Sequence, residues 1–393
     1  MDVATLRELR LRVQGLRAPF DLSAPEVVRR FVAVQAQEFV PAQWGLAARV
    51  PREQRPDVAS VAAAIDDGEI LRTHVLRPTW HFLHRDDARW VLDLSAERVH
   101  RANATYYRRT GLEGADVARA MDLVAAALDG GHRTRAEIIA ALEADGMPKA
   151  GLGFTYVMMH AELERVAISG ANVGRQRTYA AFDERVPAAA PKPRDEALAE
   201  LAARFIASRG PVTDRDFASW SGFTLGDTRQ AFADAADRAG AHGGRIEQVD
   251  VDGVTHLLDA EAVAAASARS DGARDAGHRD DGDGDHGIVD LLQAYDEYIM
   301  GYAAPRAYLL PDGIDALHAE FPLHALMIDG VMCGRWAPVA DTKRVRVRLV
   351  PWRGFTAREE RGLEASVADL EAFFGLPAAI EREAVTSVER RIE

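Results

Sequence analysis

The sequence predicts an α+β fold in which one arrangement of helices and strands occurs three times before a β-rich C-terminal domain. Three observations lead to this prediction. Segments with helical apolar spacing come in groups of three, and two short runs typical of β-strands follow each group. A linker rich in Pro and Ala, at 187–196, separates the second group from the third. After residue 288 the helical spacing gives way to short β-like runs.

The three groups share the same order of elements. Helical apolar spacing is found at 24–36, 42–49 and 58–66, at 116–129, 134–144 and 152–165, and at 195–208, 213–219 and 225–237. The β-type runs that follow are 70–75 and 79–83, 166–170 and 177–183, and 245–249 and 254–259. Three helices followed by a hairpin form the pattern of a winged helix. We therefore predict three tandem winged-helix motifs, at 1–112, 113–190 and 191–265.

Two of the expected helices carry their own start signals. Thr134 precedes RAEI with Glu137 three residues later, and Thr213 precedes DRDF with Asp216 three residues later. In such a capping box the Thr hydroxyl and the acidic side chain each satisfy a backbone N–H at the start of the helix. Helices are therefore expected to begin at these two threonines.

The last part of the chain is expected to contain a loop and then a β-rich α+β domain. Residues 266–287 are rich in Asp and Gly with almost no large apolar residue, which predicts a flexible acidic loop. Its DGDGDH sequence lacks the downstream Glu of a calcium loop, so no calcium site is predicted. Within the domain, 288–393, we expect a hairpin at Asp329-Gly330 and a helix at 356–374.

Composition is that of a globular protein of two to four domains, with 393 residues, 48% hydrophobic and 28% charged. No apolar run approaches the roughly 18 residues that span a bilayer, and the single Cys333 fits a reducing compartment. We expect a cytoplasmic, nucleoid-associated monomer. The net charge of −13 means that a DNA-binding surface has to be a confined basic track.

Basic and polar residues gather at the expected wings. The first wing, in RTHVLRPTWHFL (72–83), carries Arg72, His74, Arg77, Thr79 and His81. The second, in GANVGRQRTY, carries the group Arg175, Gln176 and Arg177. Arginines on a wing favour phosphate contacts, so we expect the four arginines to face one concave channel. The alternatives are a solvated hairpin for the second wing and a metal site at the two histidines. No third ligand follows at a recognisable spacing, so no metal is predicted.

One polar pair stands in an apolar stretch, FVAVQAQEF at 31–39. A helix would place Gln35 and Gln37 about 200° apart, whereas an extended segment would place both on one side. Neither arrangement is an obvious way to bury two amides, since each needs hydrogen-bond partners or water. A function for the pair is therefore worth seeking.

The sequence resembles a bacterial family of winged-helix DNA glycosylases, which confer azinomycin resistance and unhook interstrand crosslinks. The matching stretches are LRVQGL, VQAQ with the Trp of PAQW, LRTHVLRPTWHFL, HAELERVAISG with GRQRTYA, GPVTDRDFASWSG, and YDEYIMGY with DGVMCGRW. They follow one another over nearly the whole chain. The sequence departs from the family in the 266–287 insertion and at Arg209, where the resemblance leads us to expect histidine.

The resemblance implies that Gln35 and Gln37 form the catalytic Q-x-Q motif of the family and line a cleft. It implies a monofunctional glycosylase for cationic N7- or N3-alkylated purines in double-stranded DNA, including bulky adducts and crosslinks. An alkylated purine is a good leaving group, so two neutral amides can hold the water and stabilise the sugar cation. Water is the expected nucleophile, because no lysine precedes Lys149, and no cofactor is expected.

Two further groups of residues are candidates for the site. At the C-terminal hairpin Met327, Asp329, Val331 and Met332 are candidates for contact with the lesion, with ordinary packing as the alternative. In YDEYIMGY, the acidic pair Asp296 and Glu297 either lines a cleft or forms an ionic anchor. Two other classes of function stay open: a non-enzymatic DNA-binding protein, such as a regulator or a DNA-shielding resistance protein, and a protein that binds the cytotoxin itself.

Overall fold

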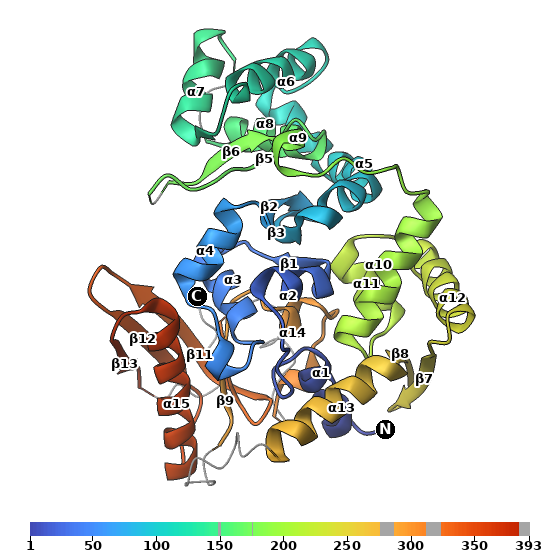
Figure 1. Ribbon diagram of the computed structural model, residues 1–393, viewed down its shortest axis with the longest axis vertical. Helices are drawn as coiled ribbons and strands as arrows, with labels where there is room; N and C mark the ends of the chain where they lie inside the picture. The colour runs from blue at the N-terminus through green and yellow to red at the C-terminus, as the bar shows by residue number, and fades with distance from the viewer. Residues whose placement is uncertain (148–150, 175, 276–286, 312–323, 385–393) are drawn as a thin grey trace. The chain divides into compact units, whose positions relative to one another are not determined.

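The computed structural model of the protein, drawn in Figure 1, describes residues 1–147, 151–174, 176–275, 287–311 and 324–384. The chain forms two compact units, each assembled from separate stretches of sequence. The first unit contains residues 1–27, 38–60 and 202–393, and the second contains residues 28–37 and 61–201. Both units mix helices and sheets. No helix in the described part of the chain is long and apolar enough to cross a membrane.

The second unit contains a three-stranded antiparallel sheet of order β1-β3-β2. Its strands are β1 (Ala33–Gln35), β2 (Ile70–Val75) and β3 (Arg77–His84). The helices that precede the β2–β3 hairpin along the chain are α2 (Ala24–Phe31), α3 (Phe39–Ala47), the 3-10 helix η1 (Arg52–Gln54) and α4 (Val58–Asp66). Every residue of β2 is buried, and Leu76, with a φ of 62°, turns the chain into β3.

A second sheet in the same unit has the corresponding order, β4-β6-β5. Its strands are β4 (Arg133–Thr134), β5 (Ala167–Ser169) and β6 (Thr178–Ala181). The helices around it are α5 (Arg85–Thr110), α6 (Ala115–Leu128), α7 (Arg135–Ala144), α8 (Leu152–Leu163) and α9 (Phe182–Arg185). The predicted capping box is present, because Thr134 Oγ1 accepts a hydrogen bond from Glu137 N at 3.3 Å and Thr134 N donates one to Glu137 Oε2 at 2.7 Å.

The third group of elements ends in a two-stranded sheet. It consists of α10 (Arg194–Arg209), α11 (Asp214–Ser221), α12 (Leu225–Ala241), β7 (Ile246–Val251) and β8 (Val254–Asp259). In the first two groups a third strand, β1 or β4, precedes the second helix of the group and pairs with the hairpin. Val212 takes the same position before α11, where it forms a single β-bridge with Leu257 of β8. The predicted capping box between Thr213 and Asp216 is also present.

The C-terminal sheet has five strands in the order β13-β12-β11-β10-β9. They are β9 (Val289–Leu292), β10 (Ala325–Ile328), β11 (Val331–Ala340), β12 (Val345–Pro351) and β13 (Ala378–Arg382). α15 (Ala357–Phe374) confirms the predicted terminal helix, and its Leu363, Leu370 and Phe373 join the buried core of the sheet. The first unit also contains α1 (Val3–Val13), α14 (Glu297–Met300) and the 3-10 helix η2 (Ala307–Leu309).

Two expectations about the extent of secondary structure are wrong. The helix expected at 24–36 ends at Phe31, because Val32 adopts a φ of 66° and the next three residues pair with β3 as β1. Part of the acidic stretch expected to be a loop is helical, since α13 (Ala260–Asp275) extends through it. Its Ala-rich sequence favours a helix. Residues 276–286 of that stretch lie outside the described residues.

Candidate active site and nucleic-acid interface

Gln35 and Gln37 lie at the end of β1 in the second unit. Gln35 is the last residue of the strand and is 2% exposed, whereas Gln37 follows the strand and is exposed. Gln35 Oε1 accepts a hydrogen bond of 2.9 Å from Arg77 Nη2. Gln37 Oε1 accepts one of 3.3 Å from the backbone N–H of Trp80. Both amides are therefore held by β3, one inside the fold and one at its surface.

One face of the β1-β3-β2 sheet gathers several of the predicted site residues. His81 of β3 pairs with Gln35 on one side and with Thr73 on the other, so these three side chains form a cross-strand row. Arg77 joins the row through its hydrogen bond to Gln35. Thr79 Oγ1 is buried and has no hydrogen-bond partner among the described residues, while its carbonyl oxygen lies 2.9 Å from His81 Nδ1.

Trp80 lies on the opposite face between two basic side chains. The His74 ring centroid is 3.8 Å from that of Trp80, and Arg72 Cζ lies 4.1 Å from the indole centroid, within cation–π range. Arg72 Nε also donates a hydrogen bond of 3.0 Å to the carbonyl of Ala36, between the two glutamines. Burial, with a contribution from the charge of Arg177, lowers the pKa of Arg72 to about 10. A buried cation thus supports the backbone of the motif.

Glu162 of α8 is a functional candidate that the sequence analysis missed. Its side chain is fully buried, and its Oε2 lies 2.6 Å from His74 Nδ1 and accepts a hydrogen bond of 3.1 Å from His74 N. This contact fixes the orientation of the imidazole beside Trp80. Its sequence signal is weak, because it is one of two glutamates in the mixed stretch HAELERVAIS and its partner is 88 residues away along the chain.

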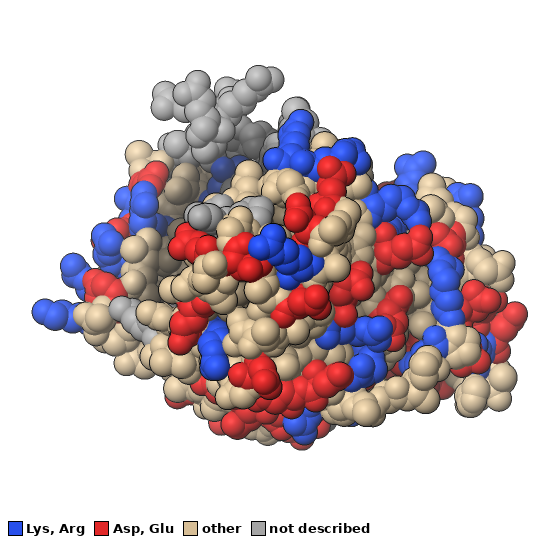
Figure 2. All heavy atoms as spheres, turned by 90° about the horizontal axis from the view of Figure 1, so that it is seen from above, with Lys and Arg blue, Asp and Glu red and all other residues tan. Residues whose placement is uncertain are grey.

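The second predicted wing lies between β5 and β6. Gln176 and Arg177 are exposed there, and Gln176 N donates a hydrogen bond of 3.0 Å to Val173 O. Arg175 lies outside the described residues. The charge of Arg177 contributes to the lowered pKa of Arg72. On the face drawn in Figure 2, basic and acidic side chains are interspersed, so a basic surface on this face is confined to small patches.

The C-terminal hairpin has the predicted turn, and its two methionines are buried. Asp329-Gly330 adopts φ values of 49° and 82°, as a two-residue hairpin turn requires. Met327 is 0% exposed and Met332 is 3% exposed, and Val331 is half-buried. A Cβ on the turn glycine would lie 2.7 Å from Leu11 Cδ1, so the tip packs against α1. Both methionine side chains belong to the core, which favours ordinary packing, the alternative that the sequence leaves open.

Asp296 and Glu297 form buried ion pairs, each being 1% exposed. Arg49 donates two hydrogen bonds, of 2.9 and 2.7 Å, to Asp296. Arg209 donates two, of 3.1 and 2.7 Å, to Glu297 Oε2, which also accepts one of 3.2 Å from Trp220 Nε1. Carboxylates buried and paired in this way do not line an open cleft. The arrangement matches the ionic anchor that the sequence analysis held as the alternative.

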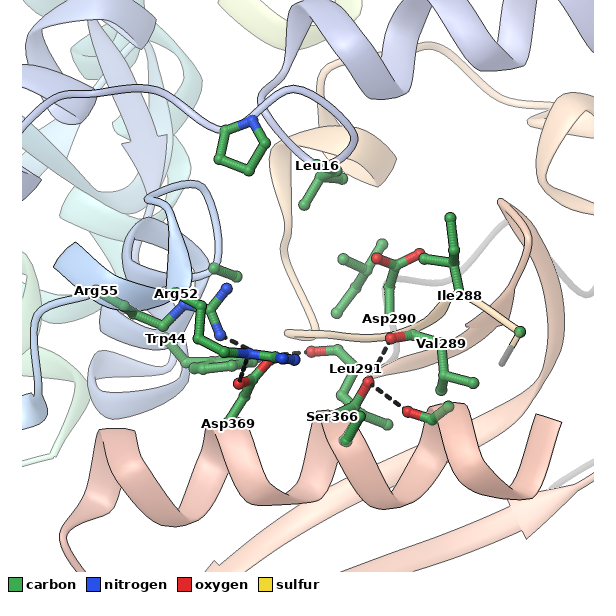
Figure 3. Close-up of a pocket in the computed structure, with 16 residues that line it drawn as sticks. Leu16, Trp44, Arg52, Arg55, Ile288, Val289, Asp290, Leu291, Ser366 and Asp369 are labelled. Atoms are coloured by element: carbon green, nitrogen blue, oxygen red, sulfur yellow. Dashed lines mark hydrogen bonds and ion pairs between the residues drawn. The ribbon is translucent and has the colours of Figure 1, made fainter. Parts of the chain in front are cut away.

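A cavity of about 210 Å³ lies within the first unit (Figure 3). Trp44, Arg52, Arg55 and Asp369 contribute to its wall. Arg52 Nε and Arg55 Nη1 lie 2.6 and 2.8 Å from the two oxygens of Asp369, so the carboxylate compensates both cations. None of the predicted catalytic or DNA-contacting residues lines this cavity.

The sequence also identifies the class of protein. The chain is a DNA glycosylase: it belongs to the AlkZ-like DNA glycosylase family, whose model matches residues 28–373. Over 368 residues it is 26% identical to the interstrand DNA cross-link repair glycosylase of Streptomyces sahachiroi. The aligned region covers 87% of this chain and 91% of that protein. The solved structure of the S. sahachiroi DNA glycosylase AlkZ has the same fold, with a TM-score of 0.73 and 22% identity over 97% of this chain and 100% of that chain.

Proposed function

We propose that the protein is a monofunctional glycosylase that hydrolyses the N-glycosidic bond of N7- or N3-alkylated purines in double-stranded DNA. The observation that carries the proposal is the pair of amides at the end of β1, with Gln35 Oε1 held by Arg77 and Gln37 exposed beside it. Alkylation makes the purine cationic, so the base leaves as a neutral molecule without a strong general acid. The site has only to hold water and stabilise positive charge on the sugar.

The two glutamines take different parts in this reaction. Gln37, at the surface, contacts the nucleotide and holds the water that attacks C1′. The C1′–N bond breaks, its electron pair moves to the purine, and a water proton passes to solvent. Gln35 is buried and oriented by Arg77, and its amide oxygen is the negative end of a fixed dipole that stabilises the developing sugar cation. No lysine precedes Lys149, which favours water over a Schiff base as the nucleophile.

The three groups of helices and strands are proposed to be tandem winged helices that hold DNA as a monomer. The corresponding sheet orders β1-β3-β2 and β4-β6-β5, and the bridge between Val212 and Leu257, support this interpretation. Arg177 and Gln176 are exposed at the second wing, where they contact phosphates. His74 and Arg72 present the Trp80 ring close to the glutamine motif.

Bulky adducts and interstrand crosslinks are proposed to be substrates as well. The similar S. sahachiroi protein is named for cross-link repair. The exposure of Gln37 supports bulky adducts and crosslinks as substrates of this protein, because an exposed catalytic amide does not require the base to enter an enclosed pocket.

The test is single-turnover release of base from DNA that contains N7-methylguanine. We expect Gln37→Ala and Gln35→Ala each to slow release about tenfold or more, and the double variant to lose nearly all activity. Gln248→Ala, at an exposed glutamine of β7, is the matched control and should keep the full rate. Thermal unfolding checks that each variant is folded. Unchanged release by the folded double variant would contradict the proposal.

A further inference from the structure

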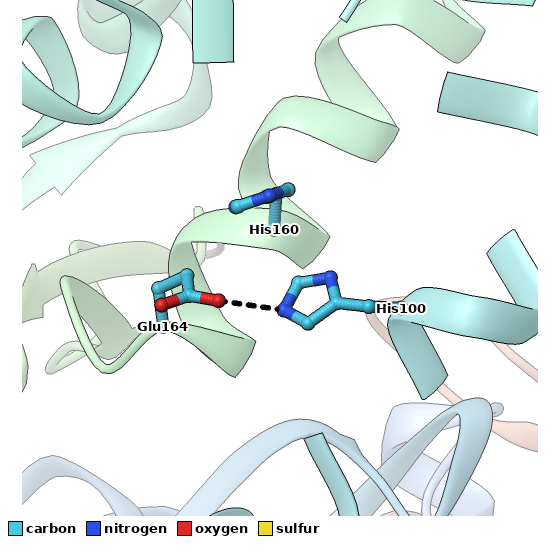
Figure 4. Close-up of side chains that lie close together, drawn as sticks. All are labelled: His100, His160 and Glu164. Carbon is cyan, nitrogen blue, oxygen red and sulfur yellow. Dashed lines mark ion pairs between the residues drawn. The ribbon is translucent and has the colours of Figure 1, made fainter. Parts of the chain in front are cut away.

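His100, His160 and Glu164 form a cluster in the second unit that the proposed reaction does not use (Figure 4). His100 comes from α5, His160 from the last turn of α8, and Glu164 is the residue that caps α8. Figure 4 shows the three side chains converging between the two helices. One ligand atom from each lies within 4.8 Å of the others. In the part of the chain that the structure describes, this is the one such group of three His, Cys, Asp or Glu side chains.

Sequence spacing alone did not reveal this group. His160 and Glu164 are four residues apart on α8 and therefore share a face, but their partner lies 60 positions earlier on another helix. The sequence predicts no metal site, because His74 and His81 have no third ligand at a recognisable spacing and DGDGDH lacks the Glu of a calcium loop. The packing of α5 against α8 supplies the third ligand.

The contacts prepare the two imidazoles as ligands. His100 Nε2 lies 2.9 Å from Glu164 Oε1, and His100 Nδ1 lies 2.9 Å from the Tyr107 hydroxyl. A partner on the second ring nitrogen is the usual way in which a ligating imidazole is oriented. His160 Nδ1 is buried without a hydrogen-bond partner among the described residues, and the two rings lie 4.4 Å apart.

We propose that His100, His160 and Glu164 bind one divalent transition-metal ion of the zinc type, with water as the fourth ligand. Two imidazoles and one carboxylate are a ligand set that zinc accepts. Bonds of about 2.0–2.2 Å require tetrahedral ligand atoms to lie roughly 3.3–3.6 Å apart. Small side-chain rotations suffice to reach this from 4.8 Å. The Glu164 side chain is 51% exposed, so an ion and its water can enter from solvent.

The ion would act as a clamp between α5 and α8. α8 also carries Glu162, whose carboxylate contacts His74 beside Trp80. Fixing the end of α8 therefore limits the movement of a residue that supports the proposed DNA-contacting face. The site lies on different residues from the glutamine motif, and its test does not depend on glycosylase activity.

The experiment is a titration of the chelator-treated full-length protein with Co²⁺, followed by visible absorption and then by competition with Zn²⁺. We expect one Co²⁺ per chain, with the visible d–d absorption of tetrahedral Co²⁺, and displacement by Zn²⁺. Glu164→Gln and His160→Gln should each weaken binding at least tenfold. His132→Gln is the matched control, because His132 also pairs with a glutamate, Glu184, at 3.1 Å.

Thermal unfolding gives a second readout. Zn²⁺ should raise the midpoint of the wild-type protein and of His132→Gln, and raise that of Glu164→Gln less at the same Zn²⁺ concentration. The metal-free midpoint reports whether each variant is folded. Absence of Co²⁺ binding by the folded wild-type protein would overturn the proposal, and so would equal affinities for the wild-type protein and both ligand variants.

Discussion

Arg77 donates a hydrogen bond of 2.9 Å from Nη2 to Gln35 Oε1 and so fixes the amide of a buried glutamine at the end of β1. Two roles for Arg77 give different predictions. If it positions Gln35, Arg77→Met lowers the single-turnover rate at saturating DNA about tenfold or more and leaves the salt dependence of binding unchanged. If it contacts a phosphate, the variant lowers the slope of log affinity against log salt by about 0.9.

The hydrogen bond leads us to expect the first result for Arg77→Met. Arg101→Met, at an exposed arginine of α5 that pairs with Glu97, is the control and should match the wild-type protein in both measurements. A normal rate combined with a lower salt slope would assign Arg77 to the DNA backbone instead.

Elements that are determined by residues close together in the sequence were predicted correctly. The capping boxes at Thr134 and Thr213, the turn at Asp329-Gly330 and the terminal helix α15 all depend on neighbouring residues, and each is present in the structure. The strand β1 was missed, because its three residues pair with β3 residues that lie 46 to 50 positions later and are too few to give a local strand signal.

For the candidate site, too, the sequence did not show contacts between residues that are far apart along the chain. Gln35, Arg77 and His81 were selected from the sequence, but only the pairing of β1 with β3 shows that they share a face. Glu162 was missed because a single buried carboxylate on a helix is unrelated by spacing to the histidine that it contacts. The sequence left the exposure of Met327 open, since packing against distant elements decides the exposure of a hairpin tip.

The second wing gives a prediction about salt. Arg177 is exposed, and removing one arginine from a DNA phosphate reduces the log–log salt slope by about 0.9. We therefore expect Arg177→Ala to flatten the slope by about one and the double variant with Arg175→Ala to flatten it by about two, with weaker binding to all sequences alike. Fluorescence anisotropy between low and physiological salt measures this. Arg382→Ala, in β13, is the control; an unaltered slope in the double variant would remove this wing from the DNA interface.

The start of α15 gives a prediction about acid stability. Two hydrogen bonds from Arg353, of 2.8 and 2.7 Å, together with the backbone N–H of Thr356, lower the pKa of Glu359 from 4.5 to about 2. A lowered carboxyl pKa adds stability that is fully present above pH 4.5 and is lost as the pH falls toward 2. Because the Arg353 side chain is half exposed, the contribution is at most about 1 kcal/mol.

Glu359→Gln should therefore lower the urea midpoint at pH 6 and have a smaller effect at pH 3, where part of the wild-type contribution is already lost. Glu364→Gln, at an exposed glutamate of the same helix, is the control and should leave the pH dependence as it is. An equal loss of stability at both pH values would assign the effect to helix capping by the side chain rather than to its charge.

The last prediction concerns Arg209, which stands where the family resemblance leads us to expect histidine. Its side chain is 0% exposed and donates two hydrogen bonds to Glu297, and the carboxylate also accepts one from Trp220. Removing one member of such a pair leaves a buried charge uncompensated, which costs about 3–5 kcal/mol of unfolding free energy. We therefore expect Arg209→Met to be strongly destabilising in urea unfolding at pH 7.

The double variant Arg209→Met/Glu297→Gln should be more stable than Arg209→Met, because no buried charge is left without a partner and the amide oxygen can still accept from Trp220. A coupling energy of about 1–3 kcal/mol in this double-mutant cycle is the expected result. Arg209 also packs against Phe205 and Trp220, and this packing changes equally in the single and the double Arg209→Met variants. The cycle therefore isolates the penalty of an unpaired carboxylate from the loss of packing. If the losses of unfolding free energy are additive, the packing of the Arg209 side chain, and not its ion pair with Glu297, accounts for the stability that the residue contributes.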